Sequence, residues 1–101
     1  MIYTVSLVND ENLKQELKVL KKAGIFSSFE KKTTGILRLN PLGGKPLSGD
    51  LQGLYRYRLL KDWRIIYYVD TTHKEVKILS VDNRKRIYND PSDILKRLDN
   101  L

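Results

Sequence analysis

Basic side chains gather in the middle of this sequence, within and just beyond the stretch RYRLLKDWRIIYYVD. Arg56 and Arg58 lie two positions apart, Arg64 follows across a short polar break, and residues 84–86 read Arg-Lys-Arg. A guanidinium group stays charged at every relevant pH and binds two phosphate oxygens at once. Residues two apart on a strand project from the same face. If neighbouring strands pair, these cations therefore converge on one concave patch that can bind phosphate. The alternative for each arginine taken singly is a solvated strand.

Aromatic residues alternate with these arginines, and two interpretations are open for them. Tyr55, Tyr57, Tyr68 and Tyr88 can stack unpaired bases if they lie beside the cations. They can also fill the core, which we expect for Trp63 and for at least half of the tyrosines.

Residues for other kinds of catalysis are scarce. The chain has no cysteine and one histidine, which excludes disulfides, thiolate metal sites and thiol catalysis. His73 falls in a predicted hairpin turn, where we expect a surface residue. His, Asp and Glu show no metal-ligand spacing, so we expect no metal and no cofactor. Asp62 and Asp82 are expected to be structural.

Composition indicates a soluble globular protein with an anionic partner. Of 101 residues, 41% are hydrophobic and 31% charged, and the formal net charge is +7. Residues 45–88 hold ten Lys or Arg against five Asp or Glu, and such an excess favours nucleic acid. The opening MIYTVSLV lacks secretion-signal features, and no apolar run approaches the roughly 20 residues of a membrane span. We expect one domain, residues 1–101, in the cytoplasm and away from membranes.

The elements that position these groups begin with a strand at residues 2–7, where residue types alternate. Asn9 or Asp10 can cap a helix that ends at Ala23-Gly24, and a second helix is predicted over residues 28–39. The apolar stripe of the first helix is Leu13, Leu17 and Leu20. The predicted inner side of the second is Phe26, Phe29, Thr33, Ile36 and Leu37.

Residues 40–50 read as a loop because they contain two prolines and three glycines. Three strands follow at residues 54–60, 63–69 and 76–81, the second nearly continuous in apolar residues and therefore central. Asp90-Pro91 predicts the start of a last helix over residues 91–101. The order β-α-α-β-β-β-α predicts an α+β domain with an antiparallel sheet carrying an N-terminal helical hairpin.

The order of these motifs resembles the RelE/ParE toxin superfamily of bacterial and archaeal toxin–antitoxin systems. Members have a loop of the form Lys-x-Leu-x-Gly, a strand rich in Tyr and Arg, a Tyr-Arg-Ile-Ile-Tyr strand, and an arginine four residues before a tyrosine. The corresponding segments here are Lys45–Gly49, Leu54–Arg58, Trp63–Tyr67, and Arg84 with Tyr88.

The resemblance implies a type II toxin that cuts messenger RNA in the ribosomal A site without a metal, by attack of the RNA 2′-hydroxyl on the adjacent phosphate. By position, Arg64 and Arg84 would stabilise the phosphorane, and Tyr88 would be the base or an orienting group. Many relatives have Gly-His-Arg where this chain has Asp82-Asn83-Arg84, so a histidine acid or base is excluded there. The RNA-binding residues would be Lys45, Arg56, Arg58, Lys61, Lys85 and Arg86.

The resemblance also implies partners and rival functions. The partners would be a cognate antitoxin protein that covers the sheet and helices, messenger RNA, and the ribosome. The chief alternative is the ParE branch, which shares the fold and poisons DNA gyrase. A third reading is a non-catalytic relic that binds only antitoxin or RNA. We expect the final helix, residues 91–101, to move when the antitoxin binds.

Overall fold

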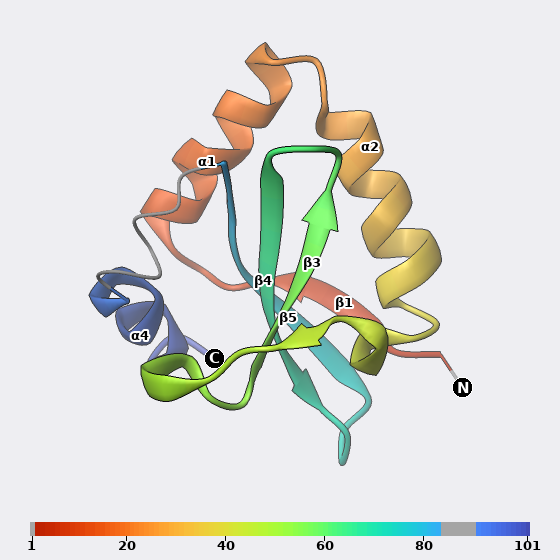
Figure 1. Cartoon of the computed structure of the whole chain (residues 1–101), viewed down its shortest axis with the longest axis vertical. Helices are drawn as coiled ribbons and strands as arrows, with labels where there is room; N and C mark the ends of the chain where they lie inside the picture. The colour runs from red at the N-terminus through yellow and green to blue at the C-terminus, as the bar shows by residue number, and fades with distance from the viewer. Residues whose placement is uncertain (1, 84–90) are drawn as a thin grey trace.

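The computed structural model describes residues 2–83 and 91–101, and it shows helices packed on a five-stranded sheet (Figure 1). The strands are β1 (Thr4–Leu7), β2 (Lys45–Pro46), β3 (Leu54–Leu59), β4 (Trp63–Asp70) and β5 (Glu75–Asp82). Their order across the sheet is β1-β5-β4-β3-β2, with β1 parallel to β5 and the other neighbours antiparallel. The predicted α+β class and the central place of β4 are confirmed. The predicted antiparallel sheet is confirmed for β2, β3, β4 and β5, and β1 adds one parallel neighbour at its edge.

Helix α1 (Glu11–Lys22) begins and ends where its sequence predicts. The Asp10 side chain accepts a hydrogen bond of 3.0 Å from the Leu13 N–H, which satisfies one free donor of the first turn. Gly24 follows with φ +75°, a conformation that glycine adopts without strain. The turn at Gly24 leads directly into α2, so α1 and α2 diverge from it as two sides of a V around the β3–β4 hairpin (Figure 1).

The second helix differs from its prediction in start and geometry. Helix α2 (Phe26–Lys31) begins two residues early and continues as a π-helical segment, η1 (Lys32–Leu37). Thr33 donates to the carbonyls of the preceding turn at 3.1 and 3.0 Å, and Thr34 does so at 2.7 Å. Such hydroxyls compete with backbone donors and distort helices. The altered register leaves Ile36 36% exposed, which corrects its predicted inward position.

The predicted loop contains a strand. Residues 40–50 form a short helical turn η2 (Pro41–Gly43), then β2, then a second turn η3 (Gly49–Leu51). Strand β2 pairs with β3, so its two residues add an outer edge to the sheet. It was missed because two residues cannot display an alternating pattern.

Close contact with Tyr67 holds this segment against the sheet. The buried Tyr67 hydroxyl donates a 2.6 Å hydrogen bond to the Pro41 carbonyl. A Cβ added at Gly44 would collide with that hydroxyl and lie 2.9 Å from the Arg56 carbonyl oxygen. Position 44 therefore needs a residue without a side chain.

An ion pair completes the edge of β5. Strand β1 covers β5 only as far as Ile78, and beyond it the Glu16 carboxylate accepts hydrogen bonds of 3.0 Å from both the Ser80 hydroxyl and the Val81 N–H. Arg97 donates to Glu16 at 2.9 and 3.0 Å and to the Leu79 carbonyl at 2.8 Å. The Glu16–Arg97 pair therefore makes the backbone hydrogen bonds with this part of β5 that a neighbouring strand would otherwise make.

Arg97 belongs to the last helix, α4 (Ser92–Leu98). Its Nε also lies 3.4 Å from Asp10, the cap of α1, so one guanidinium ties the end of the chain to its first helix. Pro91 occupies the N-cap and not the predicted first helical position, and Asp90 lies outside the described residues. Among the helices that the structure describes, none combines the length and apolarity needed to cross a bilayer.

Candidate nucleic-acid interface

The strand register places four basic side chains on one face of the sheet. Arg58 lies directly across from Arg64, and Lys45 lies directly across from Arg56. Residues opposite each other in an antiparallel pair project to the same side, as do residues two apart on one strand. The four cations therefore share one face of the sheet. Tyr68 projects from this face too, because it lies four positions after Arg64 on β4.

In the strand register these cations face one another and have one acidic neighbour, Asp82, directly across from Arg64 on β5. Within residues 2–83 and 91–101, no carboxylate lies at salt-bridge distance from Lys45, Arg56, Arg58 or Arg64. Like charges directly opposite on neighbouring strands are destabilising. Arg64 makes a 3.1 Å hydrogen bond to the Asp62 carbonyl in the hairpin turn, which fixes its guanidinium but does not neutralise it. A face of this kind is suited to an anion supplied from outside.

We define the basic face as Lys45, Arg56, Arg58 and Arg64. These four side chains differ in their exposure to solvent. Lys45 and Arg58 are exposed, whereas Arg56 and Arg64 are half-buried. Arginine can bury its aliphatic stem while its guanidinium stays in water, so all four cations can meet a bound chain. Lys61 lies exposed in the turn between β3 and β4, beside this face.

Two of the candidate stacking residues lie on the other side of the sheet. Tyr55 stacks on Tyr67 with ring centroids 5.8 Å apart, and the Lys32 ammonium lies 5.7 Å from the Tyr57 ring centre. Both tyrosines alternate with Arg56 and Arg58 along β3 and so face the helices. Of the two interpretations open for these tyrosines, packing against the core is the one the structure shows, because strand alternation places them on the opposite face from the arginines.

The remaining predicted site residues, Arg84, Lys85, Arg86 and Tyr88, lie outside the described residues. The structure shows where the chain departs toward them: β5 ends at Asp82, which lies across from Arg64 in the register. Asp82 is 5% exposed.

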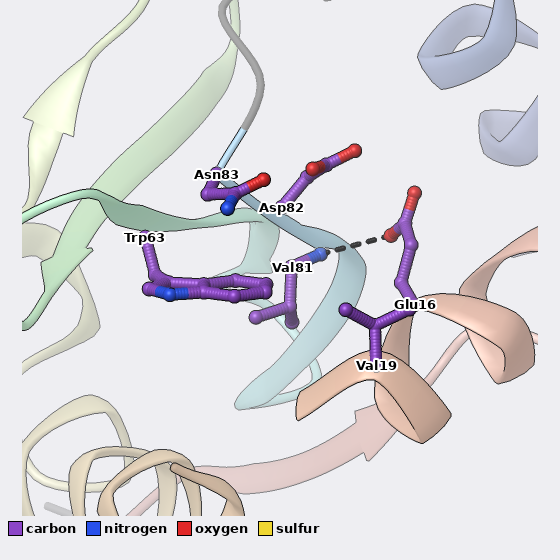
Figure 2. Close-up of a pocket in the computed structure, with 6 residues that line it drawn as sticks. All are labelled: Glu16, Val19, Trp63, Val81, Asp82 and Asn83. Atoms are coloured by element: carbon purple, nitrogen blue, oxygen red, sulfur yellow. Dashed lines mark hydrogen bonds between the residues drawn. The ribbon is translucent and has the colours of Figure 1, made fainter. Parts of the chain in front are cut away.

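A pocket of about 170 Å³ lies at the same end of the sheet, between α1 and the ends of β4 and β5 (Figure 2). The half-buried Trp63 indole reaches toward Val19 of α1, and Asn83 stands at the end of β5. The sequence predicted Trp63 as core and assigned Asn83 no positive role. Sequence analysis also missed Glu16 and Arg97, because only their burial in the folded protein distinguishes them from surface residues.

The groups with shifted pKa values lie away from the basic face. Burial raises the pKa of the Tyr67 phenol to about 12. The exposed His73 hydrogen-bonds Asp70 at 2.8 Å in the β4–β5 turn, and this contact raises the pKa of His73. His73 is a surface residue, as predicted. No group of three or more His, Cys, Asp or Glu within the described parts of the chain is placed to hold a metal ion.

Comparison with known proteins gives a consistent assignment. A family model described as the ParE toxin of type II toxin–antitoxin systems, parDE, matches residues 10–88. Toxin RelE of Mycobacterium tuberculosis is 40% identical over 45 residues, which is 45% of this chain and 45% of that protein. The match therefore spans less than half of that relative.

Solved structures extend the likeness to most of the chain. The toxin–antitoxin complex RelBE2 from Mycobacterium tuberculosis has a chain that is 32% identical with a TM-score of 0.71, covering 83% of this chain and 100% of that one. A free-state arginine-to-alanine double variant of Escherichia coli toxin RelE shares the fold, with a TM-score of 0.71, 20% identity and coverage of 97% and 99%. The chain belongs to the RelE/ParE toxin superfamily of type II toxin–antitoxin systems.

Proposed function

We propose that this toxin is a ribosome-dependent endoribonuclease that cleaves messenger RNA in the A site, with residues 1–101 acting as one domain. The observation that carries the proposal is the pair of like-charged cross-strand contacts, Arg58 with Arg64 and Lys45 with Arg56. Their mutual repulsion is relieved by an RNA backbone, whose phosphates carry the opposite charge. The similarity to chains described as RelE toxins supports the same reading.

The proposed reaction uses the RNA as its own nucleophile. The 2′-hydroxyl oxygen bonds to the adjacent phosphorus and gives its proton to a base, while the bond from phosphorus to the 5′-oxygen breaks and that oxygen takes up a proton. The products are a 2′,3′-cyclic phosphate and a 5′-hydroxyl end. The pentavalent intermediate carries extra negative charge on its equatorial oxygens, which fixed cations can stabilise.

Arg64 is the described residue best suited to this role. It is half-buried, and its guanidinium donates a 3.1 Å hydrogen bond to the turn carbonyl of Asp62, which favours one orientation of the group. Arg84 is proposed as its partner. Tyr88 is proposed as base or orienting group, and cations beside it would favour its phenolate form.

The other cations are proposed to grip the backbone on either side of the cut. These are Lys45, Arg56, Arg58, Lys61, Lys85 and Arg86. The proposed site has few groups that could act as a general acid or base. We therefore propose that the ribosome orients the 2′-hydroxyl, and such orientation can contribute several kcal/mol. No metal is proposed in this mechanism.

Induced expression followed by primer extension on a translated message and its untranslated twin tests the proposal. Cuts are expected only in the translated message. Arg64→Ala and Arg84→Ala should each reduce cleavage by roughly 100- to 1,000-fold, whereas Arg38→Ala, an exposed arginine at the end of η1, is the matched control. A smaller loss in Tyr88→Phe would make Tyr88 an orienting group. Efficient, site-specific cutting of purified naked RNA would refute ribosome dependence.

A second candidate is inhibition of DNA gyrase, because the matching family model is described as the ParE toxin. The same basic face could bind DNA phosphates. Growth arrest with intact messages and inhibited gyrase would favour this candidate, and growth without arrest would indicate a relic that only binds antitoxin or RNA.

We also propose a cognate antitoxin as partner, as in the complex described as RelBE2. An acidic, amphipathic segment would suit both the net charge of +7 and the exposed apolar side chains at the surface. Co-expression of a neighbouring acidic protein should restore growth and give a complex stable to gel filtration. The proposed antitoxin would be contradicted if no neighbouring gene product bound the toxin tightly.

A further inference from the structure

The pocket beside Trp63 has the dimensions and walls of a site for one planar ring. Its volume of about 170 Å³ equals between five and six waters at ~30 Å³ each. Among the residues that the structure describes, the lining consists of Glu16, Val19, Trp63, Val81, Asp82 and Asn83. Figure 2 shows the Trp63 indole and Val19 pointing toward each other, with Asn83 at the end of β5. The site thus combines an aromatic surface, aliphatic sides and one side-chain amide.

We infer that this pocket binds one unpaired nucleobase of the RNA that lies on the basic face, and that it selects adenine. The inference rests on the proposed function for its RNA ligand. Aromatic side chains are the usual platforms for splayed-out bases. An asparagine amide offers one donor and one acceptor, which match N7 and N6 of adenine.

The position of the pocket connects it to the phosphate site. Trp63 directly precedes Arg64 on β4, and Asn83 directly follows Asp82, which lies across from Arg64. The pocket and the Arg64 guanidinium therefore share one end of two neighbouring strands. Trp63 and Arg64 project to opposite faces of the sheet. Because Trp63 is the first residue of β4, a nucleotide whose phosphate binds Arg64 can turn its base around the strand end and onto Trp63.

The charges of the lining argue against other ligands. Glu16 and Asp82 are carboxylates, so a phosphate group would be repelled there. An arginine from a protein partner is disfavoured too, since the Glu16 oxygens already accept from Arg97, Ser80 and the Val81 N–H. A neutral base needs no countercharge.

Trp63 is the chain's single tryptophan, so its fluorescence reports on this pocket alone. The purified full chain is titrated with oligoadenylate and oligouridylate of equal length, both 2′-O-methylated so that they cannot be cut, and each carrying an end label for anisotropy. Oligoadenylate should quench Trp63 at a roughly ten-fold lower concentration than oligouridylate. Asn83→Ala should abolish that preference, whereas Asn12→Ala, an exposed asparagine on α1, should keep it.

Each outcome decides the inference. Labelled RNA that binds without changing Trp63 emission would overturn the pocket and leave the proposed nuclease intact. Quenching by an arginine amide but not by RNA would assign the pocket to a protein partner and overturn it as well. Absence of RNA binding in both fluorescence and anisotropy would also overturn the base-binding pocket. The cleavage assay would then test the proposed nuclease activity separately.

A second readout uses the ribosome. Primer extension across many codons should show cuts enriched at one position relative to adenine, and Asn83→Ala should redistribute them. A merely structural role for Asn83 would change the amount of cutting and leave its distribution the same, which would contradict selection by the pocket.

Discussion

At the scale of single residues, position 44 is where a methyl group has no room. The hydroxyl of Tyr67 and the carbonyl of Arg56 occupy the space that a Cβ at Gly44 would need. Gly35, in contrast, has nothing within 4 Å of an added Cβ. The two glycines thus serve as each other's control, because the same substitution meets a filled site in one case and open space in the other.

We expect Gly44→Ala to lower the free energy of unfolding by about 1–3 kcal/mol, as overpacking does. Gly35→Ala should raise it by about 0.5–1 kcal/mol, since alanine restricts the unfolded chain and favours helical backbone. Urea denaturation followed by circular dichroism measures both. Equal effects of the two substitutions would contradict the packing described for Gly44.

The single histidine provides a clean titration. The hydrogen bond that the Asp70 carboxylate accepts from the His73 ring raises the pKa of His73 above 6.5, and the backbone N–H and ring of His73 lower the pKa of Asp70 below 3.8. The His73 contribution to stability is therefore present below pH 6.5 and is lost as pH rises through its folded pKa. The Asp70 contribution is present above pH 3.8 and is lost as pH falls through its folded pKa.

Proton NMR of the His73 ring should give a pKa above 6.5 in the wild type, and Asp70→Asn should bring it back toward 6.5. Asparagine keeps the oxygen that accepts from the Thr72 and His73 backbone, so the turn is preserved while the charge and the acceptor of the His73 ring are removed. An unchanged histidine pKa in Asp70→Asn would show that the contact does not persist in solution.

At the scale of elements, the β3–β4 hairpin keeps a repulsive pair where sheet stability alone would favour an attractive one. Arg58 and Arg64 lie directly opposite each other. We expect Arg58→Glu to raise the free energy of unfolding by about 0.2–1 kcal/mol, less at high salt, because it forms an opposite-charge pair. Toxicity should fall in the same variant. Arg38→Glu is the control, with no cross-strand partner; a stable but fully toxic Arg58→Glu protein would contradict a role for the basic face.

The Glu16–Arg97 pair joins α1, α4 and the edge of β5. Arg97 is 3% and Glu16 9% exposed, so removing one partner leaves a buried charge. Arg97→Met should lower the free energy of unfolding by about 3–5 kcal/mol, and adding Glu16→Gln should recover part of the loss. Lys96→Met, at the exposed neighbouring position, should have little effect. Additive losses in the double variant would mean that the two side chains do not interact.

Prediction from sequence succeeded for elements with a local pattern. The Leu13 and Leu20 stripe and the Asp10 cap mark α1, and the apolar run marks β4 as central. Strand β2 and the parallel pairing of β1 carry no local signal, because they depend on which segments meet in space. The π-helical geometry of η1 was not predicted, because the hydrogen bonds of its threonines to preceding carbonyls form only in the folded helix.

The same dependence on contacts between distant segments explains which site residues could be predicted from the sequence. Arg58 and Arg64 could be paired from sequence because a tight hairpin sets its own register. Glu16 reads as a solvated residue of an amphipathic helix, and its partner Arg97 lies 81 positions away. The Trp63 pocket likewise needs α1 to lie over the strand ends, which no local periodicity specifies.

At the scale of the whole molecule, the net charge of +7 should make RNA affinity fall with salt. The logarithm of the binding constant for single-stranded RNA should fall linearly with the logarithm of salt concentration between about 50 and 200 mM. Arg58→Gln should reduce the slope by roughly 0.7, the value for one phosphate contact, and Arg38→Gln should not change it. An unchanged slope in Arg58→Gln would place the RNA elsewhere on the surface.

The parallel pairing of β1 with β5 also governs when the protein can exist in its folded form. Thr4 lies beside Glu75, so the first strand cannot pair until about 70 further residues have been synthesised. At about 5–20 residues per second, that interval is about 4 to 14 s. Throughout it the nascent chain has an incomplete sheet, and the basic face lacks the strand that supports β4. The time taken by translation thus delays the complete sheet until synthesis has passed β5.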